Sequence, residues 1–499
     1  MSRKNDISSN EVGTLVCTFD GPSATEFSFV VTNNATAIPV RTGQFICIKS
    51  EDGMLVGMVT EIIKSNRYFS RAESVREYER GGHPLSTIFP ADRWEFVLAK
   101  ALPMGVFANG SIDRVSFPPS PGEKVYLAEE SILTQFLGLD SDRGLDIGNI
   151  RYHEVSARLN ITKLFQKHVA VLAMSGGGKS YLSSVLIEEL LSRNENQGRI
   201  ATIVIDVHGE YTVFADGDFS DRVDVIRSPY VQIATPLLRA GMYGVFQPQI
   251  SPIQLRELDR ILSNVGKGTK PFSITNVIKA TEADDHINVR TREALLGWLY
   301  GLENTGLFGY EENPDLKSTI QPGKCLILDL SETTSLRKKQ IIVAYLLWRL
   351  FSLRKAGEIA PFVIFLEEAH QFCPEAKISS AISKNIIETV AREGRKFHSS
   401  LCLISQRPVR LSTTVLSQCN THIILRVTNP YDLDHIKASS EQITRESLKM
   451  ISTLPVGEAL IVGAAVNYPV FVKIRRRKSR EPAHSLTLEE AAKRFEGSS

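Results

Sequence analysis

At 499 residues the chain is too long for one compact core, and two or three domains are expected. Hydrophobic residues make up 42% of the chain and charged residues 23%, which is the usual composition of a soluble globular protein. The formal net charge of +2 neither requires nor excludes a nucleic acid as partner, because a local basic channel does not show in the total.

Targeting and metal-binding signals are missing from the sequence. The amino terminus lacks the apolar segment of a signal peptide, and no apolar run reaches the ~20 residues needed to span a bilayer. The six cysteines are scattered, with neither a C-x-x-C pair nor the spacing of a zinc site, and most of them lie in apolar runs. We therefore expect a cytoplasmic protein with reduced core cysteines and no membrane partner.

Residues 1–140 contain short apolar or alternating runs separated by turn residues, a pattern that predicts a small β-barrel or sandwich. The expected strands are Gly13–Phe19, Phe27–Thr32, Gln44–Lys49, Leu55–Ile63, Trp94–Ala101 and Lys124–Leu127. A charged stretch, Arg71–Arg80, interrupts this pattern and predicts a solvent-facing helix.

In residues 141–480, apolar runs of strand length alternate with amphipathic runs of helical length, which indicates a parallel sheet covered by helices. The expected strands are His168–Ala173, Ile200–Asp206, Cys325–Leu330, Phe362–Leu366, Ser400–Ser405 and His422–Val427. The expected helices include Ser180–Arg193, Arg337–Arg354 and Ser379–Lys396. Residues 250–315 read as an inserted helical subdomain, and residues 481–499 form a tail. The tail segment Lys473–Arg480 is basic, and its run Arg475–Lys478 is expected to be solvated, with DNA binding as the alternative.

A glycine-rich loop, Ala173–Ser180, lies between the first of these strands and the first helix. It has the form G-x-x-x-x-G-K-S, with Ala173 in place of the first glycine. Such a loop directs backbone N–H groups at phosphates, and the helix after it adds its positive dipole end. We expect Lys179 to bridge the β- and γ-phosphates and Ser180 to bind Mg²⁺. The residues predicted to bind ATP are Ser175, Gly176, Gly177, Gly178, Lys179, Ser180 and Tyr181.

Two glutamates, Glu367 and Glu368, directly follow the strand Phe362–Leu366. Carboxylates at the carboxyl end of a central parallel strand point into the crevice where a nucleotide binds. We assign Glu367 to Mg²⁺ and Glu368 to the attacking water. The alternative, two acids that open an exposed loop, is weakened by the phosphate-binding loop elsewhere in the chain.

Other polar residues also follow predicted strands or helices. Asp206 and Glu210 come after one strand, and Gln406 follows another. A capping aspartate and a turn glutamine are equal alternatives for these two sites. A neutral amide suits a sensor of the γ-phosphate, because it bonds phosphate or water without competing for metal. Arg392 and Arg395 end the helix before the Gln406 strand, from where an arginine can reach a neighbouring subunit's γ-phosphate. A solvated helix end, favoured by the helix dipole, is an equal alternative for both.

Together these motifs resemble the HerA family, of the HerA/FtsK class of P-loop motors, over nearly the whole chain. The matching features are the β-rich amino-terminal region, which is like a HAS-barrel, and the motifs His168, Asp206–Tyr211, Phe365–His370, Ala391–Arg395, Ser405–Pro408, Thr428–Pro430 with Asp432, and Gly457–Ala459. Two residues depart from the family pattern. Ala173 stands where the family has glycine, and Glu367 stands where it more often has aspartate, so hydrolysis is expected to be slowed or adjusted at worst.

The resemblance implies a homohexameric ring that moves double-stranded DNA through its pore without reading sequence. It also implies a NurA-like nuclease partner and a role in DNA end resection for recombinational repair. Arg395 aligns best with the trans-acting arginine of the family, and Arg392 is second. An ATP-gated scaffold that activates a nuclease effector in antiviral defence is the alternative. A small-molecule kinase is disfavoured, because no acceptor pocket or lid is visible.

DNA contacts are the least determined part of the prediction. The candidates leave the same sheet edge as the ATP site, namely Lys377 and the run Arg407–Arg410, or lie in the helical insertion, namely Lys267 and Lys270. Each of them could equally be an ordinary surface cation. The amino-terminal barrel is expected to carry the contact with a nuclease or another effector.

Overall fold

The computed structural model describes residues 10–17, 21–32, 40–66, 69, 72–80, 94–108, 110–268, 271–440, 443–481 and 488–497. The chain divides into two compact units. The first comprises Met1–Asp142, Gly148–Arg158 and Val466–Lys473, and the second comprises Arg143–Ile147, Leu159–Ala465 and Ile474–Ser499. Among the described residues, no helix is long and apolar enough to cross a membrane.

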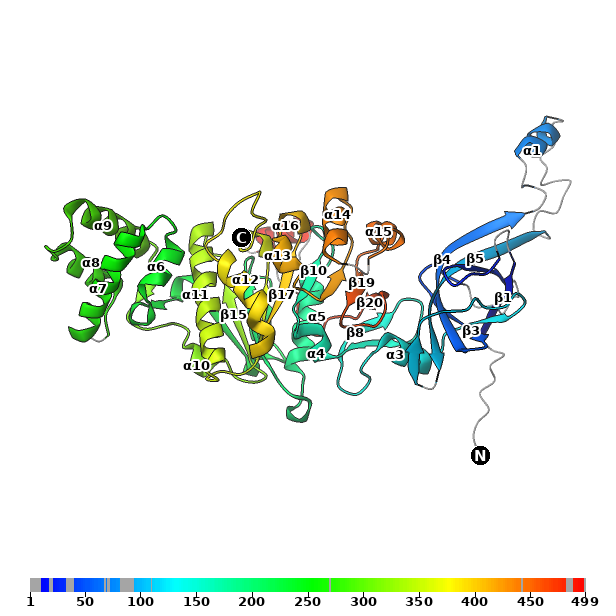
Figure 1. Cartoon of the computed structure of the whole chain (residues 1–499), viewed down its shortest axis with the longest axis horizontal. Helices are drawn as coiled ribbons and strands as arrows, with labels where there is room; N and C mark the ends of the chain where they lie inside the picture. The colour runs from blue at the N-terminus through cyan, green and yellow to red at the C-terminus, as the bar shows by residue number, and fades with distance from the viewer. Residues whose placement is uncertain are drawn as a thin grey trace. The chain divides into compact units, whose positions relative to one another are not determined.

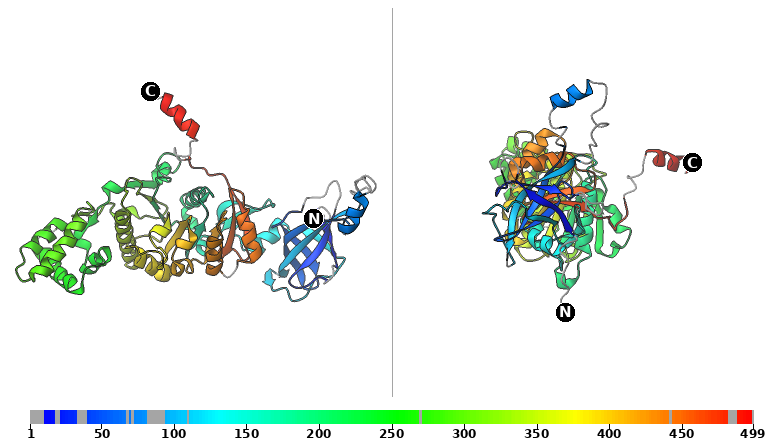
Figure 2. Two further views of the ribbon diagram at one scale, coloured as in Figure 1. Left: turned by 90° about the horizontal axis from the view of Figure 1, so that it is seen from above. Right: turned by 90° about the vertical axis from the view of Figure 1, so that its right-hand side faces the viewer.

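The first unit contains a closed β-barrel, as the sequence predicted. Its strands are β1 (Glu11–Val16), β2 (Phe27–Val31), β3 (Phe45–Ser50), β4 (Gly53–Asn66), β5 (Glu95–Ala108), β6 (Ser111–Asp113) and β7 (Lys124–Leu127). Their order is β2-β1-β7-β3-β4-β5-β6, and the pairing of β2 with β5 closes the barrel. Alternate side chains of these strands, such as Phe27 and Phe29, fill its interior. The strands, blue to cyan, form one group in both views of Figure 2.

The second sheet is largely parallel, again as predicted, and most of its residues belong to the second unit. Its strands are β8 (Leu145–Ile150), β9 (Ser156–Leu159), β10 (Val169–Leu172), β11 (Ala201–Asp206), β12 (Val223–Arg227), β15 (Cys325–Asp329), β16 (Phe362–Leu366), β17 (Ser399–Ser405), β18 (Thr421–Ile424), β19 (Glu458–Gly463) and β20 (Val470–Ile474). The order is β12-β15-β11-β16-β17-β10-β18-β19-β20-β8-β9. The pairs from β12 to β18 are parallel, and β18 pairs with β19 antiparallel. The central strands are buried on both faces, so they read as continuous apolar runs.

Helices pack around this sheet or form the insertion. Those that pack around the sheet include α5 (Lys179–Leu191), α11 (Leu336–Lys355) and α12 (Lys384–Glu393). The insertion consists of α6 (Ala240–Phe246), α7 (Pro252–Gly268), α8 (Ile274–Glu282) and α9 (Val289–Glu303), framed by the short strands β13 (Ile233–Ala234) and β14 (Phe308–Gly309). These four helices form a group of their own in Figure 1. The remaining helices are α1 (Ala72–Glu79), α3 (Glu130–Leu137), α4 (Ile161–Phe165), α10 (Leu316–Thr319), α13 (Thr413–Leu416), α14 (Pro430–Ser439), α15 (Arg445–Ser452) and α16 (Leu488–Gly497).

Some elements differ from the sequence prediction. The helix expected at Ser379–Lys396 begins only at Lys384 and ends at Glu393, followed by a 3₁₀ turn, Gly394–Phe397. Its expected first residues stay in the loop, because Ser383 donates its hydroxyl to Phe372 O at 2.8 Å instead of capping the helix. The edge strand β12 was not predicted, since its residues alternate with charges and carry no long apolar run.

Candidate active site

The loop Ala173–Gly178 joins β10 to α5 at the carboxyl edge of the parallel strands. Ala173 is fully buried, and its N–H donates to Ser405 O at 3.3 Å. The N–H of Met174 donates to Arg426 O at 2.9 Å. The chain segments that follow β17 and β18 therefore hold the loop from both sides.

Three glycines give this loop its shape. Gly176 and Gly178 have φ angles of 71° and 93°, in the left-handed region that glycine adopts without steric cost. A Cβ on Gly177 would lie 3.0 Å from the Ala173 Cβ and 3.0 Å from Met174 O. The result is a tight concave turn at the amino terminus of α5, the arrangement that binds phosphate.

The other predicted nucleotide-binding residues lie along the loop and the start of α5. Ser175 is exposed in the loop, while Lys179 and Ser180 are half-buried in the first turn of the helix. Tyr181 follows them, and its hydroxyl accepts the N–H of Arg477 at 2.8 Å. The contact with Arg477 could not be foreseen, because the two residues lie far apart in sequence.

Glu367 and Glu368 follow β16 at the same edge, and both are buried. Glu367 Oε2 accepts the N–H of Val207 at 2.9 Å. Glu368 has a φ of 46°, a conformation that costs free energy for a residue other than glycine and recurs at functional sites. Burial raises the pKa of Glu368. Burial also raises the pKa of Glu367 well above its usual range, and the nearby negative charges of Asp206 and Glu210 raise it further.

Lys179 brings the loop and these carboxylates together. Burial lowers the pKa of its ammonium group, and the negative charges of Glu368, Glu367 and Glu210 act in the opposite direction. Three acidic side chains thus surround the lysine at the end of the loop. Because the carboxylates raise one another's pKa, the site favours an additional cation.

Asp206 stabilises the turn that follows β11. Its Oδ1 accepts the N–H groups of His208, Gly209 and Glu210 at 3.2, 2.7 and 3.1 Å, and its Oδ2 accepts that of Tyr211 at 2.8 Å. This is the capping role given as the alternative from sequence. The turn carries Glu210 toward Lys179, so Asp206 positions a side chain that does face the loop.

Gln406 and His370 both contact Glu368. Gln406 hydrogen-bonds to the Glu368 carboxylate, which acts against the rise in its pKa. His370 Nδ1 lies 3.2 Å from Glu368 Oε2 and 3.2 Å from the hydroxyl of Ser405. Burial, reinforced by neighbouring arginines, lowers the pKa of His370 to about 4, so the imidazole is neutral at pH 7. Its place in the Glu-Glu-Ala-His run was the available signal for this contact.

Lys339 of α11 is a contributor that the sequence did not reveal. It is buried, and its ammonium donates to Val207 O at 3.4 Å. Burial lowers its pKa, while the charges of Glu367, Asp329 and Asp206 oppose this. The lysine therefore offsets part of the negative charge behind Glu367. In sequence it is one of several basic residues at the start of a long helix, with no motif around it.

Arg392 and Arg395 lie near the end of α12 and in the 3₁₀ turn after it, and both are exposed. Neither side chain forms an ion pair with another described residue. They are therefore free to contact a partner. Within this chain they are not brought to Glu368 or to the phosphate-binding loop.

The basic run near the carboxyl terminus is docked onto α5, contrary to the expectation of a solvated tail. We call residues 475–479 the C-terminal strap. The fully buried carboxylate of Glu188 accepts the N–H groups of Lys478 and Ser479 at 2.8 Å each and the Ser479 hydroxyl at 2.6 Å. It also pairs with Arg475 at 2.9 Å. The sequence masked this role, because Glu188 reads as one acid of an ordinary helix.

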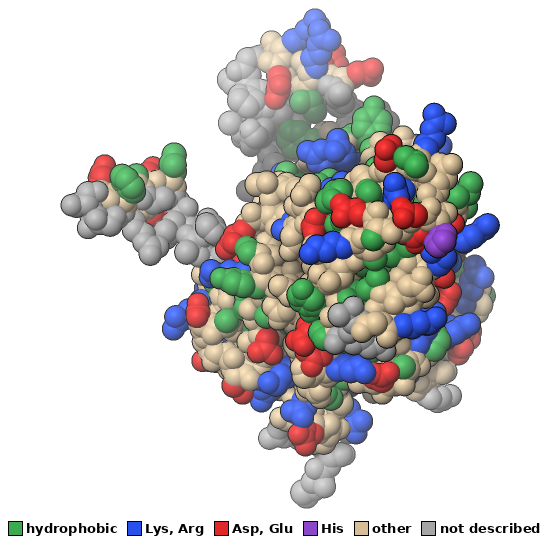
Figure 3. Space-filling model, turned by 90° about the vertical axis from the view of Figure 1, so that its left-hand side faces the viewer, with side chains coloured by type: hydrophobic (Ala, Val, Ile, Leu, Met, Phe, Trp, Pro, Cys, Tyr) green, Lys and Arg blue, Asp and Glu red, His purple; other side chains and the backbone are tan. Residues whose placement is uncertain are grey.

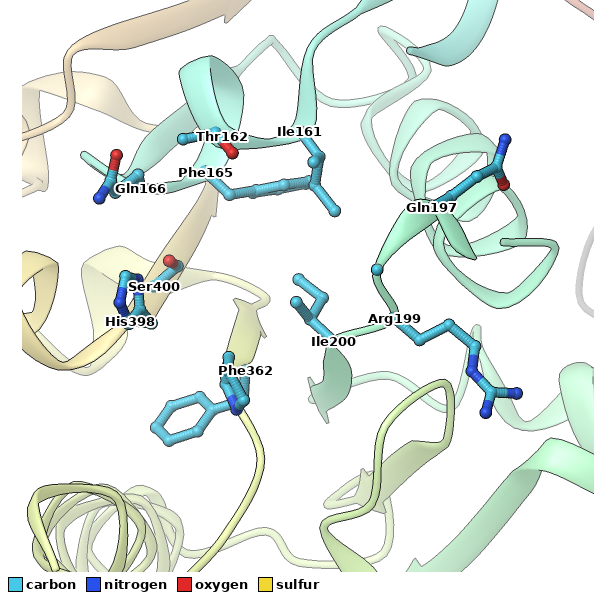
Figure 4. Close-up of a pocket in the computed structure, with 12 residues that line it drawn as sticks. Ile161, Thr162, Phe165, Gln166, Gln197, Arg199, Ile200, Phe362, His398 and Ser400 are labelled. Carbon is cyan, nitrogen blue, oxygen red and sulfur yellow. The ribbon is translucent and has the colours of Figure 1, made fainter. Parts of the chain in front are cut away.

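A separate cavity of about 400 Å³ lies at the opposite edge of the sheet. Figure 4 shows Phe362, Ile200 and Ser400, from the amino-terminal ends of neighbouring strands, among its lining residues. None of the loop residues or carboxylates described above lines it. The cavity is therefore not part of the candidate active site.

The residues at the carboxyl edge fit a magnesium-bound nucleoside triphosphate. Among the described residues, no group of three or more His, Cys, Asp or Glu side chains is arranged to hold a metal alone. Mg²⁺ is usually held by one or two protein oxygens together with phosphates and water, which a serine hydroxyl and one carboxylate can supply. The clustered carboxylates and the glycine loop match that requirement.

Comparisons with known proteins agree with this geometry. Residues 145–350 match the family described as "Helicase HerA, central domain". A probable helicase of Methanocaldococcus jannaschii is 28% identical, over 94% of this chain and 96% of its own length. The DNA double-strand break repair helicase HerA of Pyrococcus furiosus is 27% identical, over 91% of this chain and 90% of its own.

Among solved structures, VirB4 of Thermoanaerobacter pseudethanolicus has a similar fold, with a TM-score of 0.52. It is 14% identical and covers 68% of this chain and 98% of its own.

Proposed function

The central domain of this chain belongs to the HerA helicase family and has a P-loop ATPase fold, and on that premise we propose that the protein is an ATP-driven translocase of double-stranded DNA. The observation that carries the proposal is the convergence of Glu367 and Glu368 on Lys179 at one edge of the sheet. Relatives named as DNA repair helicases align over nine-tenths of the chain, which supports DNA as the substrate.

The residues around Lys179 divide the work of hydrolysis. Lys179 neutralises the β- and γ-phosphates, and Glu368, buried with a raised pKa, accepts the proton of the attacking water. Gln406 contacts the same carboxylate and senses the γ-phosphate. Ser180 and Glu367 would hold Mg²⁺, which would supply charge neutralisation on the transferred phosphoryl group.

A homohexameric ring completes this site. Arg395 and Arg392 are exposed and have no ion-pair partner within the described chain, which is what an arginine that serves a neighbour's γ-phosphate requires. Arg395 is the first candidate and Arg392 the second. Hydrolysis by one subunit then depends on the next subunit in the ring.

DNA contacts are proposed for two loops at the same edge as the ATP site. The loop after β16 contains the exposed Lys377, and the segment after β17 contains Arg407 and Arg410, both exposed. Glu375 joins them, because its N–H donates to Arg410 O and its carboxylate accepts from Thr413. A change at the ATP site is therefore able to move both loops together. Cationic loops that bind phosphates without base contacts give sequence-independent binding.

The helical insertion supports DNA binding less well. Lys267 at the end of α7 is exposed, and Lys270 lies outside the described residues. Figure 3 views the side on which α7, α8 and α9 lie in Figure 1, and Lys and Arg are interspersed with Asp and Glu there. A mixed surface attracts a polyanion weakly.

A NurA-like nuclease that receives the DNA for end resection in repair is the partner we propose, with the amino-terminal barrel as its docking site. The barrel exposes Trp94, Phe96 and Phe117, and aromatic side chains are enriched at protein interfaces. The alternative remains an ATP-gated scaffold that activates an effector in antiviral defence. It shares the same ATP site and differs only in whether DNA is moved.

The test is ATP turnover of the full chain with and without linear duplex DNA, over a series of salt concentrations. We expect duplex DNA to raise turnover, and the stimulation to weaken as salt rises. Glu368→Gln should lower kcat about a hundredfold or more while ATP still binds, because the base is lost and the phosphate loop is kept. Displacement of a protein block from DNA then distinguishes movement from scaffolding.

Lys179→Ala is the control for turnover by a contaminant, and it should remove activity with or without DNA. Turnover that ignores DNA at every salt concentration would contradict the translocase proposal. DNA-stimulated turnover without displacement of the block would favour the scaffold.

A further inference from the structure

The cation Arg477 lies in the middle of the C-terminal strap. Its side chain is half-buried, and its Nε and Nη2 donate only to the Ser479 hydroxyl, at 3.0 and 2.9 Å. Among the described residues, no carboxylate forms an ion pair with it, whereas Arg475 of the same strap pairs with Glu188. Burial lowers the pKa of the Arg477 guanidinium, and the charges of Glu188 and Glu481, neither of which forms an ion pair with it, oppose this only in part.

The strap holds Arg477 beside the phosphate-binding loop. The Arg477 N–H donates to the Tyr181 hydroxyl at 2.8 Å, and Tyr181 directly follows Ser180 in the first turn of α5. On both sides of Arg477, Arg475 and Ser479 are anchored to the buried Glu188 carboxylate. The position is therefore built, since two anchors fix the strap and one backbone hydrogen bond fixes its centre.

We expect a nucleotide bound at the loop to extend past this position. Lys179 lies among Glu367 and Glu368, so the terminal phosphate occupies that end of the loop. The N–H groups of the loop and the start of α5 wrap the phosphates, and the sugar and base then leave over the first helical turn. Tyr181 lies on that turn and Arg477 lies against it.

We propose that Arg477 and Tyr181 form the sugar and base end of the nucleotide site, with the C-terminal strap as an essential part of that site. The planar guanidinium stacks on a base or donates to sugar oxygens, and the phenol ring supplies a second flat surface. This inference rests on the proposed ATPase function. It adds the side chains by which the site distinguishes a nucleotide from a polyphosphate that lacks sugar and base.

The experiment compares the binding of ATP and of inorganic tripolyphosphate, each with Mg²⁺, by calorimetry on the full chain. Arg477→Ala should raise the Kd for ATP about tenfold and leave the Kd for tripolyphosphate unchanged. Arg476→Ala is the matched control, because Arg476 has the same charge, is the next residue in the strap and is exposed. It should change neither Kd.

Each other outcome overturns the inference. An unchanged ATP Kd in Arg477→Ala would show that the arginine does not contact the nucleotide. Equal weakening of ATP and tripolyphosphate would show a general disturbance of the phosphate loop, and equal effects of Arg476→Ala would show a nonspecific charge effect. If the wild-type chain bound tripolyphosphate but not ATP, the proposed ATPase function itself would fail.

Discussion

At the scale of single residues, the two departures from the family pattern have physical explanations. Ala173 occupies a position whose backbone is not left-handed, so a methyl group is tolerated there, and its Cβ packs against Gly177. Glu367 reaches one methylene further than aspartate, and its Oε2 uses that length to accept the Val207 N–H. Neither substitution removes a group that the proposed chemistry needs.

The first prediction concerns this loop. Ala173→Gly should change the Kd for ATP by no more than about twofold, because the methyl group is not required by the backbone. Gly177→Ala should weaken ATP binding about tenfold or more, because its new methyl would meet the Ala173 Cβ and Met174 O at 3.0 Å. Titration of each purified variant with ATP measures both values.

The double variant Ala173→Gly with Gly177→Ala is the control for that prediction. It removes one of the two close contacts and should recover part of the lost affinity. Equal affinity of wild type and Gly177→Ala would contradict the account of the loop.

At the scale of secondary structure, the helix that begins the phosphate site also carries the C-terminal strap. Both functions use α5: its first turn bears Lys179 and Ser180, and two turns later Glu188 anchors Arg475 and Ser479. A buried carboxylate is stable only when its charge is matched by hydrogen bonds, and here the strap supplies them. The strap therefore stabilises the helix on which the nucleotide site depends.

The second prediction follows from Glu188. Burial alone would raise its pKa, but the hydrogen bonds from Ser479, Lys478 and Arg475 outweigh burial and lower it. Because the pKa of Glu188 is lower in the folded chain, its ionised carboxylate stabilises the fold fully at pH values above 4.5, the pKa in the unfolded chain. This stabilisation is lost as the pH falls through the lower pKa of the folded chain. Glu188→Gln should thus lower the free energy of unfolding by about 1–3 kcal/mol at pH 7.

Urea unfolding between pH 7 and pH 3.5 measures this difference. The difference in free energy of unfolding between wild type and Glu188→Gln should stay constant down to about pH 5 and shrink below pH 4.5. The reason is that protonation of Glu188 removes the extra stability of the wild type. Asp142→Asn, an exposed acid outside the strap, serves as control and should show no such change. A difference that grows toward acid pH would contradict the assignment.

At the scale of the whole molecule, the proposed active site requires an arginine from a second chain. The cis residues gather around Lys179, while Arg392 and Arg395 are exposed and not brought to them. The proposed ring resolves this, because a neighbour's arginine would enter the site from outside. An arginine of that kind is worth about a thousandfold in kcat in other P-loop enzymes.

The third prediction tests the ring. Arg395→Ala chains are mixed with wild-type chains and allowed to exchange. Turnover, relative to pure wild type, should then be lower than the fraction of wild-type chains in the mixture, because each mutant subunit disables its neighbour. Phosphate release across a series of mixing ratios gives the curve. Lys396→Ala, an exposed cation in the same 3₁₀ turn, is the matched control and should leave the mixture additive. A linear curve for Arg395→Ala would count against shared sites, and the same series with Arg392→Ala tests the second candidate.

Much of the architecture is local in origin and could be read from the sequence. The period-2 runs predict the barrel strands, and the apolar runs predict the buried parallel strands. A Gly-rich loop between a strand and a helix predicts the phosphate site. Each of these patterns reflects the burial and backbone freedom of a single segment. The positions of Glu367, Glu368 and Gln406 followed from the rule that parallel strands end at one edge.

The remaining features depend on contacts between segments far apart in the chain. Lys339 contacts Val207 from a distant helix, and Arg477 contacts Tyr181 from the carboxyl-terminal region, and no periodicity encodes those encounters. The basic strap reads as solvated because its charge is visible in sequence, while the buried Glu188 that neutralises it lies nearly 300 residues away. The sequence alone determined the fold class and the phosphate chemistry. Tertiary structure decided which charges are paired, because pairing depends on distance in space and desolvation.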